Sequence, residues 1–452
     1  MTRLKNTLSW TMFIMPVVLG FLLVGKGATE SNIGDASQSP LARLSKTLAE
    51  GLDYSIRLQT TATTQAPADS SQNPGNAFLN LARYQLAIEL RPDFFLTAGR
   101  LTLSVKPRAN IVWQTWEEGP LRGTNDTTDG YFVNEWLIRL SLAENLFVSY
   151  GRENLQWGPS YLLSPSNPFF SDNGRGNPKS EVAGMDFLRL VWLPLDSWTV
   201  SVISSLNRGR QENIFGDLDK IHALKLDYDG MSGYGSLILS HTESDRTRLG
   251  AYGGWTLTDA LLLYAEGGVS QGTPALYAQK NASPLGGSMT SIKTDSSKLE
   301  GTILAGGSYT MACGPTLTIE YVHNTLGYND SEASAYQDLR QNGAAALGLP
   351  GLTGSLAPFT LSRTWANGLR LSRQNYVMLQ YRQTDIWDLL DVTGRYTHNI
   401  DDGSGQVILM VDYYWGDHIQ FFSIATFTSG GRDTEFKSLL DYQWLVGMTH
   451  TF

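Results

Sequence analysis

The chain ends in the stretch YQWLVGMTHTF, residues 442–452, and this stretch decides the class of fold. Apolar or aromatic side chains occupy almost every second position from Tyr442 to Met448, and the last residue, Phe452, is aromatic. Successive side chains of a β-strand point to opposite faces of a sheet. The stretch therefore predicts a strand with one apolar face that ends at the terminus of the chain.

The same alternation with a period of two residues occurs in many earlier segments. In residues 406–415, for example, Val407, Leu409 and Val411 alternate with polar residues such as Gln406 and Asp412. Similar segments are residues 81–91, 199–206 and 316–324. A strand with one apolar and one polar face fits either a soluble β-sandwich or a membrane β-barrel.

The lengths of the connections separate these two folds. Short connections, at residues 142–145, 193–196, 258–259 and 415–417, contrast with long ones at 158–182, 271–297 and 326–370. Short turns at one rim and long loops at the other are typical of outer-membrane barrels. Because a bilayer forbids open strand edges, such hairpins must close. We predict an all-β fold, a single closed antiparallel transmembrane β-barrel in the Gram-negative outer membrane.

The N-terminus indicates export. Arg3 and Lys5 precede an almost wholly apolar run from Leu8 to Val24, followed by small residues. This pattern predicts a signal peptide over residues 1–28. A Ser39-Pro40 start and leucines at helical spacing predict a short periplasmic helix within residues 29–51. The barrel is then expected over residues 52–452.

The number of strands follows from parity. A first division gives nineteen strands when residues 94–116 are split in two. A single-chain barrel with both ends in the periplasm has an even number of strands. The apolar alternation keeps its phase across Pro107, so we interpret residues 94–116 as one strand. The prediction is about eighteen strands, within a range of roughly sixteen to twenty.

The last strand also resembles the signal that the barrel-assembly machinery of the outer membrane reads. That signal is a terminal aromatic residue behind alternating apolar positions. His450 departs from the pattern, which usually has an apolar or aromatic residue there. The resemblance implies outer-membrane lipid and the assembly machinery as partners. The residues that carry it are Tyr442, Trp444, Val446, Met448 and Phe452.

Composition and motifs exclude several functions. The formal net charge is −9, so no basic surface for nucleic acid is expected. The hydrolase motif Gly-x-Ser-x-Gly and the zinc motif His-Glu-x-x-His are missing, and the 6 histidines and single cysteine show no metal-ligand spacing. We therefore expect no enzyme activity, no metal and no cofactor.

The polar faces of the strands define the expected lumen. Charged residues on a lipid face cost about 2–4 kcal/mol for Arg or Lys near the midplane, so they should point inward. Two interpretations stay open, a hydrophilic pore and a lumen filled by paired charges, and about eighteen strands leave room for the pore. The charges expected in the lumen are Glu135, Arg139, Glu153, Arg189, Glu266, Glu320, Arg382, Asp391 and Arg395.

One segment is more specific than the rest. In residues 150–170, Gly151-Arg152 is followed by Trp157-Gly158-Pro159 and then by a loop rich in Ser, Asn, Pro and aromatic residues. The segment resembles the Wzi family of outer-membrane barrels, which hold capsular polysaccharide at the cell surface. It is interpreted either as a constriction loop or as a glycan-binding loop. Its candidate contact residues are Arg152, Trp157, Tyr161, Asn167, Phe169 and Phe170.

These observations give two functional hypotheses. The leading one is a porin-like channel for the passive passage of small hydrophilic solutes. The alternative, which the Wzi resemblance implies, is a barrel that binds or anchors surface polysaccharide.

Overall fold

The computed structural model describes residues 50–170, 172–211, 219–293 and 298–452. The predicted signal peptide, and all but the last two residues of the predicted helical segment 29–51, lie outside these ranges. Across the described part of the chain, no helix is both long and apolar enough to cross a membrane.

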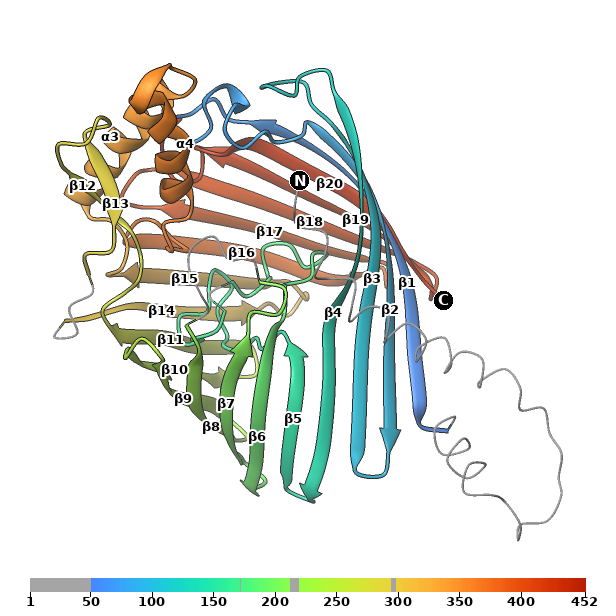
Figure 1. Ribbon diagram of the computed structural model, residues 1–452. Coiled ribbons are helices and arrows are strands. Elements are labelled where there is room, and N and C mark those ends of the chain that lie inside the picture. Colours follow the sequence, from blue (N-terminus) through green and yellow to red (C-terminus); the bar gives the residue numbers. More distant parts are fainter. Residues whose placement is uncertain (1–49, 171, 212–218, 294–297) are drawn as a thin grey trace, which may run out of the picture.

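Eighteen strands form one antiparallel sheet that closes on itself (Figure 1). The first eleven are β1 (Leu52–Pro67), β2 (Tyr84–Ala98), β3 (Leu101–Thr115), β4 (Asn125–Ala143), β5 (Leu146–Glu153), β6 (Met185–Leu195), β7 (Trp198–Asn207), β8 (Ile221–Asp229), β9 (Gly233–Thr242), β10 (Thr247–Thr258) and β11 (Leu261–Gln271). The other seven are β14 (Leu299–Thr310), β15 (Thr316–Asn324), β16 (Asn375–Ile386), β17 (Leu390–Asn399), β18 (Gly405–Trp415), β19 (Ile419–Ser429) and β20 (Leu440–Thr451).

Closure is made by the first and last strands. β1 pairs with β2 on one side and with β20 on the other. Because every strand then has two neighbours, no backbone edge is left open to lipid. The closed antiparallel barrel and the count of eighteen strands are confirmed.

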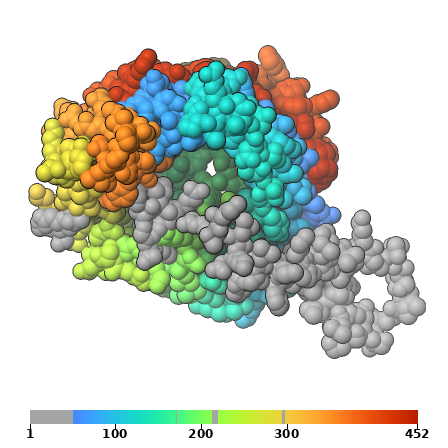
Figure 2. Space-filling view, turned by 45° about the horizontal axis from the view of Figure 1, so that its top comes forward, coloured from blue at the N-terminus to red at the C-terminus, as the bar shows by residue number. Residues whose placement is uncertain are grey.

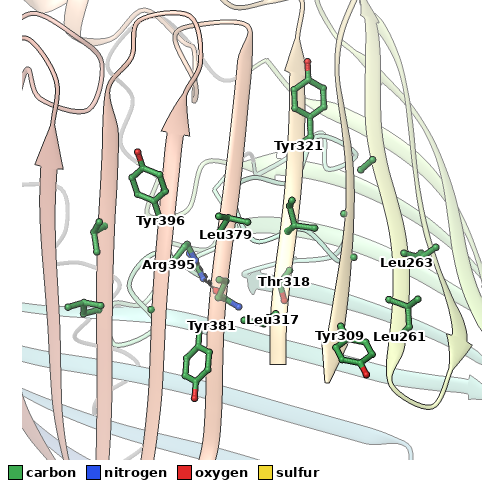
Figure 3. A pocket seen from close by; sticks show the side chains of 18 residues that line it. Leu261, Leu263, Tyr309, Leu317, Thr318, Tyr321, Leu379, Tyr381, Arg395 and Tyr396 are labelled. Carbon is green, nitrogen blue, oxygen red and sulfur yellow. Dashed lines mark hydrogen bonds between the residues drawn. The ribbon is translucent and has the colours of Figure 1, made fainter. Parts of the chain in front are cut away.

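The alternation seen in the sequence separates the two faces of the wall. In β15, Leu317, Ile319 and Tyr321 are exposed on the outer surface, whereas Thr318 and Glu320 are buried on the inner side. Figure 3 shows the outer face between β11 and β18, which carries leucines and tyrosines. The same view labels Arg395, whose guanidinium donates to the side-chain oxygen of Gln380 at 2.8 and 2.9 Å.

The prediction of one strand over residues 94–116 is wrong at its start. Phe94 to Ala98 belong to β2, and a two-residue turn at Gly99 and Arg100 leads into β3. Gly99 has a φ of +59°, a backbone conformation typical of such tight hairpin turns. From Leu101 to Thr115 the strand does run unbroken across Pro107, so the strand total was unaffected.

Long loops gather at the rim opposite the short turns (Figure 1). There α3 (Asp330–Ala346) and α4 (Gly351–Trp365) pack with a small hairpin of β12 (Tyr277–Lys280) and β13 (Gly287–Thr290). The long connection over residues 326–370 thus contains two helices. The side chain of Asn329 caps α3 and accepts a hydrogen bond from the amide of Glu332 at 3.0 Å.

The last strand presents its alternate residues outward. Trp444, Val446 and Phe452 are exposed on the outer surface. The amide of Phe452 donates to the carbonyl oxygen of Ile56 at 2.9 Å, which continues the pairing with β1 to the last residue. His450 packs edge-on against the Phe452 ring, with ring centroids 4.2 Å apart.

Candidate functional site

The connection between β5 and β6, residues 154–184, folds into the barrel, and we call it the lumen loop. It contacts inward-facing side chains of β1, β2, β3, β11, β15, β17 and β18. These strands lie all around the barrel, so the loop follows the inner wall. Figure 2 shows the hollow mouth at the long-loop rim, with the interior below it.

Glu266 of β11 anchors the middle of the lumen loop. Its carboxylate lies 2.9 Å from the hydroxyl oxygens of Ser160 and Ser164 and 2.7 Å from that of Ser166. The amide of Ser166 also donates to it, at 3.2 Å. Glu266 is 2% exposed, and a buried carboxylate needs such donors to offset its lost hydration. The serines of the loop therefore serve to hold this acid.

Glu320 of β15 anchors the next turn of the loop. The amides of Tyr161 and Leu162 donate to its carboxylate at 2.7 and 3.3 Å, and the phenol of Tyr264 donates at 2.7 Å. Arg395 of β17 stands nearby and donates to the carbonyl oxygen of Arg175 at 3.2 Å. Two acids predicted for the lumen thus bind the backbone of a loop that is distant from them in sequence.

Two glycines of the wall make room for the loop. Gly250 of β10 and Gly268 of β11 are paired directly across the sheet and face inward. The carbonyl oxygens of Ser166 and Pro165 occupy the space that a β-carbon on Gly250 or Gly268 would need. Any larger residue would push the loop backbone away from the wall.

Arg108 of β3 ties down the far end of the loop. This side chain is fully buried and contacts Glu181 at 2.7 and 2.8 Å and Asp93 at 2.9 Å. It also donates to the carbonyl oxygens of Pro92 and Pro107. Burial by itself raises the pKa of the Glu181 carboxyl, but the hydrogen bond and charge of Arg108 outweigh it, so this pKa lies below its ordinary value.

Lys179 of the loop contacts strands from both ends of the chain. Its carbonyl oxygen accepts hydrogen bonds from Gln59 of β1 at 3.4 Å and Arg91 of β2 at 3.2 Å. Its ammonium group lies 2.5 Å from the carboxylate of Asp412 of β18. The same ammonium lies over the ring of Phe422 of β19, 4.9 Å from its centroid.

The aromatic residues of the predicted contact segment pack against the wall. Phe169 and Phe170 are 7% and 4% exposed and belong to one cluster with Phe187, Ile203 and Ile238. Trp157 meets Phe169 edge-on at 6.1 Å. Asn167, 2% exposed, donates to the carbonyl oxygen of Leu155 at 2.8 Å. A surface glycan cannot reach Phe169, Phe170 or Asn167, because the loop and the wall cover them.

The other predicted charges lie in the lumen in ion pairs or hydrogen bonds. Glu153 pairs with Arg189 at 2.9 Å, and Arg152 pairs with Asp186 at 2.7 Å. Two further ones lie in pairs or hydrogen bonds near the wall or toward the turns: Glu135 with Lys106 at 3.2 Å, and Asp391 with the Asp385 amide and the Tyr414 hydroxyl at 3.0 and 3.4 Å.

Arg139 and Arg382 differ from these residues. They face inward, in register with Ser149 and Thr393 of the neighbouring strands, yet both are exposed. Both lie four residues before the end of their strand, toward the short-turn rim, where the lumen opens to water. The barrel is therefore not filled by side chains at the level of these two residues.

Several residues of the site carry no signal that sequence reasoning used. Lys179 and Glu181 lie in the loop but were not singled out, and Gly250 and Gly268 look like ordinary strand glycines. The positions of those glycines in the inward–outward alternation of their strands could have served as a signal. Both fall on the inward-facing positions of neighbouring strands, which is where a second backbone can approach.

The fold is shared with solved outer-membrane proteins. OccAB1 of Acinetobacter baumannii matches with a TM-score of 0.52 at 11% identity, over 89% of this chain and 96% of its own. The outer membrane protein OprD of Pseudomonas aeruginosa matches with a TM-score of 0.51 at 9% identity, over 88% and 94% of the two chains. OccK11 (OpdR) of the same organism gives 0.50 and 11%, over 89% and 96%.

The chain thus has the fold of an outer-membrane β-barrel. No protein-family model and no curated protein matches the sequence. At identities near one in ten, the structural likeness establishes the fold alone. None of these findings supports the resemblance of residues 151–170 to the Wzi family.

Proposed function

We propose that this protein is an outer-membrane channel through which small hydrophilic solutes pass, and that the lumen loop is its constriction. The observation that carries this proposal is the course of the loop, which follows the inner wall instead of extending from the rim. A loop in this position narrows the lumen without filling it. The charged residues along the loop and the wall then face any solute that passes.

The charges of the lumen support a hydrophilic path. Arg139 and Arg382 face inward and are exposed to water, toward the short-turn end of the wall. Acids and bases along the wall, such as Glu153 and Arg189, are paired at close range. The apolar side chains on the inner side, such as Phe187 and Leu304, are buried in clusters against the lumen loop, so the exposed inward positions at Arg139 and Arg382 are charged. The lumen offers no catalytic constellation, and we propose transport without chemical change.

We also propose the membrane setting and the partners. The outward face, with its leucines and tyrosines, fits the lipid of the outer membrane. The alternate residues from Tyr442 to Met448, with Phe452, fit recognition by the barrel-assembly machinery. The short turns, with both ends of the barrel, are placed in the periplasm.

Conductance across a planar lipid bilayer tests the channel. The refolded protein is expected to give discrete ion currents. The variant Glu266→Ala removes the anchor of Ser160, Ser164 and Ser166 and should give larger or noisier currents, because the loop is released from the wall. Glu144→Gln, on an exposed short turn, is the matched control and should behave like the unmodified protein. Absence of current from a correctly folded barrel would overturn the proposal.

A further inference from the structure

A hollow of about 420 Å³ lies where the lumen loop meets the wall of β9 to β14. Its wall residues lie near the short turns, since Tyr234 is the second residue of β9 and Ser308 stands close to the end of β14. Hollows of this size are within the range that holds small-molecule ligands. Its lining includes Tyr161 and Arg175 of the loop and Tyr234, Tyr252, Tyr264 and Ser308 of the wall.

Two of the tyrosines lie flat against the wall. A β-carbon on Gly254 would stand 2.6 Å from the ring of Tyr234, and one on Gly306 would stand 2.7 Å from the ring of Tyr264. Each ring thus covers a glycine of the neighbouring strand with one face. Tyr264 is 6% exposed and packs with Leu163 of the loop and Leu304 of the wall, whereas Tyr234 is half-buried and keeps part of its ring accessible. Tyr252 lies beside Tyr234, with ring centroids 6.4 Å apart.

Polar groups border these rings. The phenol of Tyr264 donates to Glu320 at 2.7 Å, and that of Tyr252 donates to Asp227 at 3.3 Å. The Tyr234 hydroxyl has no hydrogen-bond partner within the described ranges of the chain, so it is available to a ligand. The hydroxyl of Ser308 is shared with Thr318 at 2.9 Å.

The charged side chains around the hollow have a net positive charge. Arg175 donates to the carbonyl oxygens of Pro159 and Ser160, both at 2.7 Å, and lies 4.9 Å from the ring centroid of Tyr161. Among the described residues no carboxylate forms an ion pair with it. At this end of the loop Arg175, Arg248, Arg395 and Lys225 stand beside three carboxylates, Glu266, Glu320 and Asp227, and four minus three leaves one positive charge.

We propose that this hollow binds a sugar acid of monosaccharide size, a hexuronate, during its passage through the channel. The proposal deepens the proposed channel function and rests on it. The ring of Tyr234, with that of Tyr252 beside it, fits the apolar C–H face of a pyranose. The free hydroxyl of Tyr234 and the hydroxyl of Ser308 fit its hydroxyl groups, and Arg175 fits the carboxylate.

Titration calorimetry of the folded barrel in detergent, with glucuronate and glucose as probes, tests the subsite directly. Glucuronate should bind more tightly than glucose. Arg175→Gln should bring glucuronate down to the level of glucose, while Tyr234→Leu should weaken both by roughly tenfold or more. Tyr234→Phe, which keeps the ring, should lose a smaller part. Tyr309→Leu, on the outer face, is the matched control and should leave binding unchanged.

Blocking of ion current in planar bilayers separates this inference from the channel proposal. Glucuronate should produce brief interruptions of the potassium chloride current that become rarer in Tyr234→Leu. A barrel that conducts salt but neither binds glucuronate nor is blocked by it overturns the subsite and leaves the channel standing. A barrel that binds glucuronate but carries no current overturns the channel instead. Equal glucuronate binding by the unmodified protein, Arg175→Gln and Tyr234→Leu would also refute the subsite.

Discussion

The carbonyl oxygen of Pro165 occupies the place that a β-carbon on Gly268 would take. The two residues are distant in sequence, yet this contact brings the backbone of the lumen loop directly onto the wall of the barrel. It also brings Ser164 and Ser166 within reach of Glu266. The position of the constriction thus depends on the absence of a side chain at Gly268 of the wall.

Gly268→Ala should displace the lumen loop. A methyl group cannot coexist with the Pro165 carbonyl oxygen, so we expect a loss of about 1–3 kcal/mol in the free energy of unfolding, as in overpacked sites. Urea unfolding in detergent, followed by tryptophan fluorescence, measures this loss. The adjacent Gly267 faces lipid, and a β-carbon there meets nothing closer than 3.4 Å. Gly267→Ala should therefore stay within roughly 0.5 kcal/mol of the unmodified protein. Equal stability of the two variants would contradict the proposed contact.

Arg108→Met should be among the most damaging substitutions in the lumen. It leaves Glu181 without its buried partner, and breaking such a pair typically costs about 3–5 kcal/mol. Asp93 keeps a second partner in Arg57 at 2.7 Å. The double variant Arg108→Met with Glu181→Gln should regain part of the loss, because position 181 then carries no unpaired carboxylate. A double variant as unstable as the single one would show that the pair itself is not responsible.

The same pair predicts sensitivity to acid. The pKa of Glu181 in the folded protein lies below its ordinary value of 4.5. Its contribution to stability is therefore complete above that value and is lost as the pH falls through the lowered folded pKa. The unmodified barrel should lose stability in this acidic range more steeply than Glu181→Gln. Parallel curves of the two proteins between pH 5 and pH 2 would contradict the expectation.

Glu435 should make the loop between β19 and β20 sensitive to pH in the opposite direction. Burial, with a smaller contribution from Asp402, raises the pKa of this carboxyl to about 7, despite hydrogen bonds from Tyr376 and Ser372 that lower it. A raised folded pKa means that the folded loop binds more protons than the unfolded chain between the ordinary value and pH 7. The loop should therefore be most stable at low pH and loosen as the pH rises through 7.

Amide hydrogen exchange across residues 430–439, corrected for intrinsic rates, measures this change. Protection should be higher at pH 5.5 than at pH 8.5, and Glu435→Gln, which mimics the protonated acid, should remove the difference. The neighbouring Asp402→Asn should reduce the pKa shift without removing it. Protection that is independent of pH in the unmodified protein would contradict the expectation.

The single cysteine offers a test of orientation. Cys313 is exposed in the short turn between β14 and β15. If the short turns face the periplasm, a maleimide too large to cross the outer membrane should label Cys313 only after that membrane is disrupted. Ser355→Cys on α4, in a Cys313→Ala background, should be labelled in intact cells. Labelling of Cys313 in intact cells would reverse the proposed orientation.

The closed barrel could be predicted from the sequence because the pattern that indicates each strand lies within that strand. Alternation in strands such as Gln406 to Trp415 reflects one face toward lipid and one away from it, and every strand repeats the signal. The turn at Gly99 was not predicted, because apolar residues continue on both sides of it and the turn contains only two residues. A hairpin this tight leaves almost no gap in an apolar pattern.

The arrangement inside the barrel could not be predicted in the same way. That Glu266 and Glu320 face inward follows from phase, but their attachment to Ser166 and Tyr161 depends on the path of a loop that is 100 and 159 residues away in the chain. Nothing local distinguishes a loop that folds into the lumen from one that extends above the rim. In the sequence, Phe169 and Phe170 fit either a glycan-binding loop or a packed constriction loop, and their contacts with Phe187 show that they are packed.

Lys179 has a mechanical consequence for the barrel as a whole. The pairing of β20 with β1 is the seam that closes the barrel and joins the two ends of the sheet. Lys179 spans that seam from within, holding β1 and β2 by its carbonyl oxygen and β18 by its ammonium group. The lumen loop therefore also connects the strands on the two sides of the β1–β20 pair. A motion that moved Lys179 away from the wall would remove these connections.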